Sequence, residues 1–102
     1  MHRLSVYVPA NALEPLKEAL FKAGAGALGA YDHCCWVVKG EGQFRPLPGA
    51  HPACGEVGKV HRLEEYRLEL IVPDQAIPAV RDALLKTHPY EMPAYGFVRI
   101  EN

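Results

Sequence analysis

The sequence contains an internal repeat, because residues 67–95 match residues 3–31 at a constant offset of 64 positions without a gap. Ten aligned pairs are identical, among them Leu4/Leu68, Pro9/Pro73, Leu20/Leu84 and Tyr31/Tyr95. A repeat of this length is typical of one supersecondary unit used twice. The chain is therefore constrained to folds in which two similar halves pack around a shared core.

The first copy has the pattern of a strand followed by a helix. Apolar residues alternate with polar ones at Leu4, Val6 and Val8, which is typical of a half-buried strand. The apolar stripe of the expected helix consists of Leu13, Leu16, Leu20 and Ala23. We expect Asn11 to cap this helix, and Gly24 and Gly26 to end it.

The second copy repeats the pattern. The inward residues of its first strand are Leu68, Leu70 and Val72, and those of its helix are Ile77, Val80 and Leu84. Asp74 is the predicted N-cap, and His88 with Pro89 is expected to end the helix. In the closing strands of the two copies, the predicted inward residues are Cys34, Trp36, Val38, Val98 and Ile100.

Two strand-helix-strand units in tandem, residues 3–36 and 67–100, predict a ferredoxin-like α+β fold in a single domain of residues 1–102. The crossover rule places both helices on one face of a four-stranded antiparallel sheet. The other face is expected to carry an apolar patch made of Tyr7, Val37, Ile71, Tyr95 and Phe97. A patch of this kind is typical of an interface, so a second subunit is its predicted partner.

The composition excludes several classes of function. A net charge of −1 and a pI near 6.5 give no basis for nucleic-acid binding. No apolar run is long enough to span a membrane, and the amino-terminal stretch lacks the apolar region of a signal peptide. Three cysteines, an odd number, favour reduced thiols in the cytoplasm over a disulfide framework.

A glycine- and proline-rich segment separates the two copies, at about residues 39–60, and its core at 39–58 lacks clear periodicity. Long connections of this kind usually carry a function or form an arm. Phe44 and Arg45 are candidate ligand contacts, as an apolar anchor and an anion-binding fork. The alternative is a structural hairpin whose glycines only make turns.

Two further groups are candidates for chemistry. His88, Tyr90 and Glu91 place an imidazole beside a carboxylate, which suits acid-base work or ligand binding, although a helix-ending turn explains the same residues. A soft or divalent metal ion is the alternative cofactor, and its candidate ligands are His33, Cys35, His51 and Cys54. Against a metal, Cys34 and Cys35 are adjacent and would point to opposite faces of a strand.

Three stretches resemble a known family: GAGALGAYDHC at residues 24–34, GEGQFRPLPGAHP at 40–52 and HPYEMPAY at 88–95. They are similar to the domain inserted in the NGG-interacting-factor-three-like proteins, which are dinuclear-metal proteins, and the likeness covers essentially the whole chain. It implies the fold of the trimeric PII-like and CutA proteins. In the family the metal ligands lie in two flanking halves, which this sequence lacks, so neither metal site nor hydrolase-like activity carries over.

The resulting expectation is a non-enzymatic, homo-oligomeric module that requires no cofactor, with a trimer favoured over a dimer through the resemblance. It would bind a small molecule, or regulate a protein partner, in clefts between subunits. The candidate ligand-binding residues are Phe44, Arg45, His51, His88, Tyr90 and Glu91. The rivals are a CutA-like protein of divalent-metal tolerance and a purely structural interaction domain.

Overall fold

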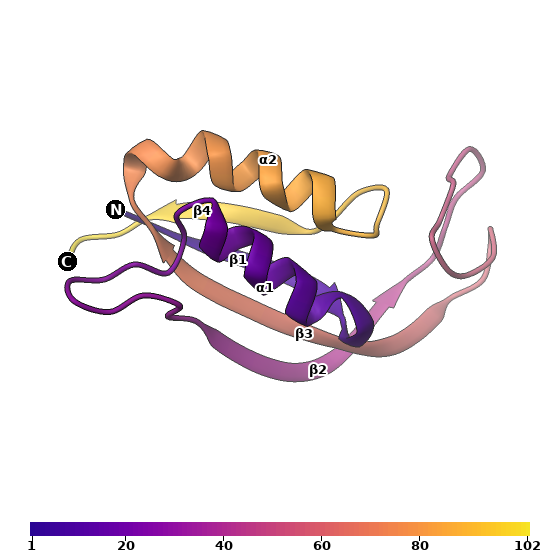
Figure 1. Cartoon of the computed structure of the whole chain (residues 1–102). Coiled ribbons are helices and arrows are strands. Elements are labelled where there is room, and N and C mark those ends of the chain that lie inside the picture. Colours follow the sequence, from indigo (N-terminus) through magenta and orange to yellow (C-terminus); the bar gives the residue numbers. More distant parts are fainter.

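Four strands form one antiparallel sheet, and both helices lie on the same face of it (Figure 1). The computed structural model describes all 102 residues. The strands are β1 (His2–Pro9), β2 (Trp36–Phe44), β3 (His61–Val72) and β4 (Tyr95–Arg99), in the order β2-β3-β1-β4. The helices are α1 (Leu13–Lys22) and α2 (Ile77–Thr87). The predicted ferredoxin-like α+β fold is confirmed.

The core lies between the sheet and the helices and follows the repeat. In five pairs of residues related by the offset of 64, both members are buried: Leu4/Leu68, Val6/Leu70, Val8/Val72, Leu16/Val80 and Leu20/Leu84. Each such side chain contributes roughly 1.5–3 kcal/mol through removal from water. The predicted inward residues of β1, β3 and both helices are therefore confirmed.

The helix starts differ from the prediction, because neither Asn11 nor Asp74 is an N-cap. A short 3₁₀ turn precedes each helix, at Ala10–Ala12 and Asp74–Ala76, and neither helix has a side-chain cap. The 3₁₀ hydrogen bonds satisfy amides that a cap would otherwise serve. The Asp74 carboxylate instead pairs with His2 Nδ1 at 2.8 Å.

The helix ends agree with the prediction. Gly24 and Gly26 have φ values of +113° and +82°, the left-handed region in which glycine ends a helix. His88 is the first non-helical residue after α2, and its N–H donates to the Leu84 carbonyl at 2.8 Å. Neither helix is long and apolar enough to cross a membrane.

The closing strands face the opposite way from the prediction. Cys35, Val37, Tyr95 and Phe97 pack against the core, whereas Trp36 and Val98 are 66% and 61% exposed. The predicted inward positions of Cys34, Trp36, Val38, Val98 and Ile100 are therefore wrong. Apolar residues occupy both faces of these edge strands, so alternation alone does not identify the inner one.

The strand register shows where the two copies diverge. Val37 lies opposite Leu68, and Phe97 lies opposite Leu4. Leu4 and Leu68 are 64 positions apart, whereas Val37 and Phe97 are 60 apart, so the first copy has four more residues between its helix and its last strand. The extra length belongs to the glycine-rich stretch that follows α1.

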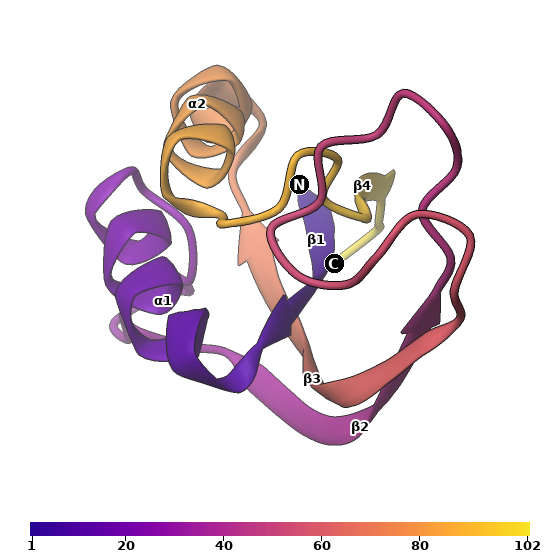
Figure 2. The same cartoon turned by 90° about the vertical axis from the view of Figure 1, so that its right-hand side faces the viewer.

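The predicted connection at 39–60 belongs to a β-hairpin, in which residues 39–44 extend β2 and the rest form the loop. β2 pairs with β3 from Trp36↔Glu69 to Phe44↔His61, whereas β1 ends beside Glu65. The hairpin thus projects beyond β1 and lengthens the molecule to 47 × 24 × 24 Å. Residues 45–60, here the arm loop, lie outside the strands, and they turn back toward residues 88–94, here the α2–β4 turn (Figure 2).

The helix-free face carries apolar residues interspersed with Arg3, Arg67 and Glu69, and the apolar members differ from the prediction. Tyr7 and Ile71 lie on it as expected, but Val37, Tyr95 and Phe97 face the helices. Three residues take their place on the patch, namely Trp36, Val38 and Val98. We call these five residues, Tyr7, Trp36, Val38, Ile71 and Val98, the outer patch.

The shared core leads to a matched prediction. Leu20→Ala and Leu84→Ala remove equivalent, fully buried side chains, and each should lower the free energy of unfolding by about 2–5 kcal/mol. Leu85→Ala, at a half-exposed position of α2, is the control and should change the free energy of unfolding by about 0.5 kcal/mol or less. Urea denaturation of the three variants measures this, and a near-zero cost at Leu20 or Leu84 would contradict the two-copy core.

Candidate functional site

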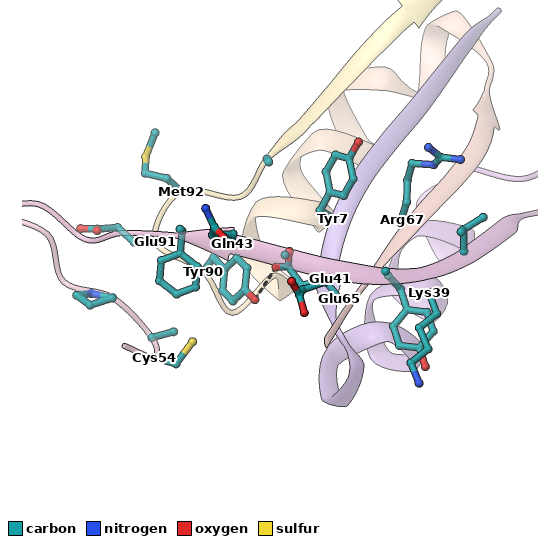
Figure 3. Close-up of a pocket in the computed structure, with 18 residues that line it drawn as sticks. Tyr7, Lys39, Glu41, Gln43, Cys54, Glu65, Arg67, Tyr90, Glu91 and Met92 are labelled. Carbon is teal, nitrogen blue, oxygen red and sulfur yellow. Dashed lines mark hydrogen bonds between the residues drawn. The ribbon is translucent and has the colours of Figure 1, made fainter. Parts of the chain in front are cut away.

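A pocket of about 540 Å³ opens on the helix-free side, where the arm loop and the α2–β4 turn come together over the hairpin (Figure 3). The strands contribute the stretch from Val38 to Phe44 and the stretch from Glu65 to Arg67. The arm loop adds Pro52, Ala53 and Cys54, and the turn adds Tyr90, Glu91, Met92 and Ala94. Tyr7, at the end of β1, completes the wall.

Hydrogen bonds hold the three segments together. The Tyr90 hydroxyl donates to Glu65 Oε2 at 2.8 Å and so ties the α2–β4 turn to β3. The His51 backbone N–H donates to Glu91 Oε1 at 3.1 Å and ties the arm loop to the same turn. Burial, together with the Glu65 carboxylate, raises the pKa of the Tyr90 phenol, so this hydroxyl stays protonated.

His88 lies beneath the pocket and anchors the turn to β1. The residue is 6% exposed, and Nε2 lies 2.7 Å from the Tyr7 carbonyl, which can only accept a hydrogen bond. The Tyr90 backbone N–H donates to Nδ1 at 3.2 Å. Both contacts require the neutral tautomer with its proton on Nε2, and burial lowers the pKa of His88, against smaller opposing effects of the Tyr7 carbonyl and Glu65.

The pocket floor depends on a glycine. The Glu65 side chain lies across Gly42, and a Cβ at position 42 would overlap the Glu65 carboxylate. Gly40 also lines the pocket on the same strand, but a Cβ there would meet nothing within 4 Å. The close approach of the Glu65 side chain therefore explains why position 42 is a glycine, whereas no contact requires glycine at position 40.

The arm loop is braced by its own contacts. The Phe44 ring stacks on His61 at 5.7 Å, and the Gly58 N–H donates to the Pro46 carbonyl at 2.8 Å. The Glu56 N–H donates to His61 Nε2 at 3.0 Å. Among the loop candidates named from the sequence, Phe44 lines the pocket, whereas Arg45 is exposed and lies outside the lining.

Of the six candidate ligand-binding residues, the structure brings five together. Phe44, Tyr90 and Glu91 line the pocket, His51 bonds to Glu91, and His88 supports Tyr90 from below. The sequence did not identify Glu65 or Gly42 as parts of the site, and Tyr7 was predicted only as a member of the apolar patch. The pair Gly40-x-Gly42, facing the long alternating stretch at 60–72, was a signal for the hairpin that creates the floor.

The four candidate metal ligands do not converge within one chain. His33 and Cys35 lie in the segment that follows α1, whereas His51 and Cys54 lie in the arm loop at the other end of the molecule (Figure 1). No group of three or more histidine, cysteine or acidic side chains is placed to hold a metal ion. His33 instead lies against the Phe21 ring, with centroids 4.6 Å apart.

Substitution of the floor glycine should release Glu65. In Gly42→Ala the methyl group displaces the Glu65 side chain and breaks its bond to Tyr90, so the free energy of unfolding should fall by about 1–3 kcal/mol. Gly40→Ala is the matched control on the same strand face, and we expect it to change stability by about 0.5 kcal/mol or less. Equal effects in the two variants, measured by denaturant titration, would argue against the Glu65–Tyr90 contact.

His88 should make stability depend on pH. Because its pKa is lower in the folded chain than the ordinary 6.5, the unfolded chain binds the proton more readily. The free energy of unfolding should therefore fall as the pH drops from about 7 through 6.5 toward the folded pKa. The difference between wild type and His88→Gln across this range isolates the residue, and a difference that stays constant with pH would contradict the neutral, buried ring.

Several known proteins are similar to this chain in sequence or in structure. No family model matches the chain. It is 44% identical over 101 residues to the GTP cyclohydrolase 1 type 2 homolog of Bacillus subtilis, and this match covers 99% of the chain and 27% of that protein. The structure of a Bacillus cereus protein related to NIF3 superposes with a TM-score of 0.85 at 36% identity, covering 99% of this chain and 26% of that one.

A second kind of structure shares only the fold. The PII-like protein CutA from Nostoc sp. PCC 7120 superposes with a TM-score of 0.71 at 16% identity, covering 100% of this chain and 83% of that one. The chain spans about a quarter of the length of the curated relatives that it matches. It is thus a homologue of one segment of the NIF3-related proteins, and its fold is that of PII-like CutA.

Proposed function

We propose that the chain is a small-molecule-binding or regulatory module, and that its ligand occupies the pocket between the hairpin, the arm loop and the α2–β4 turn. The observation that carries the proposal is that the arm loop and the α2–β4 turn are joined above the hairpin and enclose the pocket. Segments far apart in the sequence, around His51 and Glu91, meet over the hairpin and are joined by a hydrogen bond. Concave sites lined by aromatic groups with a few fixed polar ones are typical of ligand binding.

The state of the polar groups supports binding without catalysis. The Tyr90 hydroxyl is committed as a donor to Glu65, and its raised pKa disfavours a role as a base near neutral pH. Both ring nitrogens of His88 are used by backbone groups beneath the pocket. These groups position the walls and leave no free imidazole facing the cavity from this turn.

The outer patch supports a homo-oligomeric state, for which we propose a trimer on the strength of the CutA-like fold. Trp36 and Val98 are mostly exposed in the single chain, and burying such side chains stabilises an interface. Tyr7 and Val38 belong both to the outer patch and to the pocket wall. A second subunit on the patch would therefore border the ligand and place the site between subunits.

The length of the relatives bears on the function that this chain can have. Proteins named as GTP cyclohydrolase homologues are about four times as long as this chain, so the activity in that name belongs to the whole protein. We propose that the segment represented here supplies ligand binding or regulation to such proteins. A reducing compartment, the cytoplasm, suits its three free cysteines, Cys34, Cys35 and Cys54.

A thermal-shift screen over nucleotides, metabolites and divalent metals tests the proposal. At least one compound should raise the melting temperature of the wild-type chain and lose its effect in Gly40→Phe, which fills the open part of the pocket. Leu85→Phe, on the exposed side of α2, is the control and should keep the response.

The same samples report the oligomeric state by light scattering. A mass of several times 11.3 kDa at micromolar concentration is expected, and a monomer would remove the inter-subunit part of the proposal. Binding that survives in Gly40→Phe would place the ligand elsewhere, and a screen without any hit would count against ligand binding as a function.

A further inference from the structure

The charged groups around the pocket are not evenly paired. Its lining contains two cationic and three acidic side chains, namely Lys39, Arg67, Glu41, Glu65 and Glu91. Both cations pair with carboxylates outside the lining, since Lys39 Nζ lies 2.8 Å from Glu64 and Arg67 Nε lies 3.4 Å from Glu69. Figure 3 shows Lys39 directed away from the Tyr90–Glu65 pair.

Two of the three carboxylates in the lining, Glu65 and Glu91, have no cationic partner. Glu65 Oε2 accepts from the Tyr90 hydroxyl, and Glu91 Oε1 accepts from the His51 N–H, while neither group forms an ion pair with a lysine or arginine. Each therefore keeps one oxygen free to accept a hydrogen bond. The contact across Gly42 fixes the position of Glu65, so its free oxygen is oriented before any ligand arrives.

Apart from the Gln43 amide, the remaining lining is mostly aromatic or apolar. Tyr7, Phe44 and Tyr90 present rings, and Met92 adds a flexible thioether. Aromatic faces attract organic cations through their quadrupole, and a carboxylate that accepts from a charged donor strengthens that attraction. An anionic ligand would meet unneutralised carboxylates, and Arg45, the anion-binding fork expected from the sequence, lies outside this lining.

We propose that the pocket selects a small organic cation, an amine attached to an aromatic or apolar body. This inference rests on the proposed function, because it names the ligand class of the same site. The ammonium group donates to the free oxygen of Glu65, and the body lies against the neighbouring ring of Tyr90. Phosphorylated and carboxylated metabolites are disfavoured by the unneutralised carboxylates of Glu65 and Glu91.

Three compounds that share the indole ring test the charge preference by isothermal titration calorimetry: tryptamine (cationic), indole (neutral, without a side chain) and indole-3-propionate (anionic). We expect tryptamine to bind at least tenfold more tightly than indole-3-propionate, a ratio that corresponds to about 1.4 kcal/mol. Added sodium chloride should weaken the binding of tryptamine and leave that of indole unchanged.

Isosteric variants then assign the preference to residues. Glu65→Gln still accepts from Tyr90 but lacks the charge, and it should weaken tryptamine about tenfold with little effect on indole. Glu91→Gln should act in the same direction, and Glu18→Gln, on the exposed surface of α1, is the matched control. Equal affinity for the cation in Glu65→Gln and Glu18→Gln would overturn the assignment to this pocket.

The outcomes separate the two levels of the proposal. Preference for indole-3-propionate, or equal affinity for all three indoles, would overturn the cation inference and leave the binding function in place. No binding of tryptamine at millimolar concentration would also overturn the inference. If neutral and anionic compounds in the thermal-shift screen then still bind in a Gly40→Phe-sensitive way, the proposed function survives, and if none does, it fails as well.

Discussion

The antiparallel pairing of β1 with β3 is the interaction on which the rest of the structure depends. Its register sets Leu4 opposite Leu70 and Val6 opposite Leu68, so the equivalent residues of the two copies are related by a local twofold axis. One face of this pair is largely apolar and receives both helices, which bury Leu16, Leu20, Val80 and Leu84 against it. A shift by one residue would turn this apolar face to water and leave the helices without a partner.

The unequal lengths of the paired strands create the site. β3 has 12 residues and β1 has 8, so the start of β3 extends beyond β1 and pairs with β2 alone. A two-stranded ribbon of this kind gains little stability by itself. Hydrogen bonds to the α2–β4 turn fix the position of the ribbon, because Tyr90 bonds to Glu65 and Glu91 bonds to the arm loop. His88 bonds the α2–β4 turn to the Tyr7 carbonyl, so the pocket is anchored to the central strand pair.

The sequence predicted the fold and the inner core because the repeat and the alternation acted together in β1, β3 and both helices. It did not predict the facing of β2 and β4, since Trp36-Val37-Val38 and Phe97-Val98 offer apolar side chains to both faces. Its prediction of Asn11 and Asp74 as N-caps was wrong, because 3₁₀ turns satisfy the helix amides in their place. Five of the six candidate ligand-binding residues lie together in the structure. The contact between Glu65 and Gly42, however, can be recognised only once β2 is known to pair with β3.

The pocket lies where the two copies stop being alike. At the offset of 64, His88, Tyr90 and Glu91 correspond to Gly24, Gly26 and Ala27, which have no side chains able to reach across the sheet. In the first copy these positions end α1 through left-handed glycines and lead into the four extra residues before β2. The symmetric part of the chain thus builds the core, and the asymmetric part builds a single site. Because only one copy carries the anchoring imidazole, phenol and carboxylate, a second pocket of this kind cannot form at the twofold-related position.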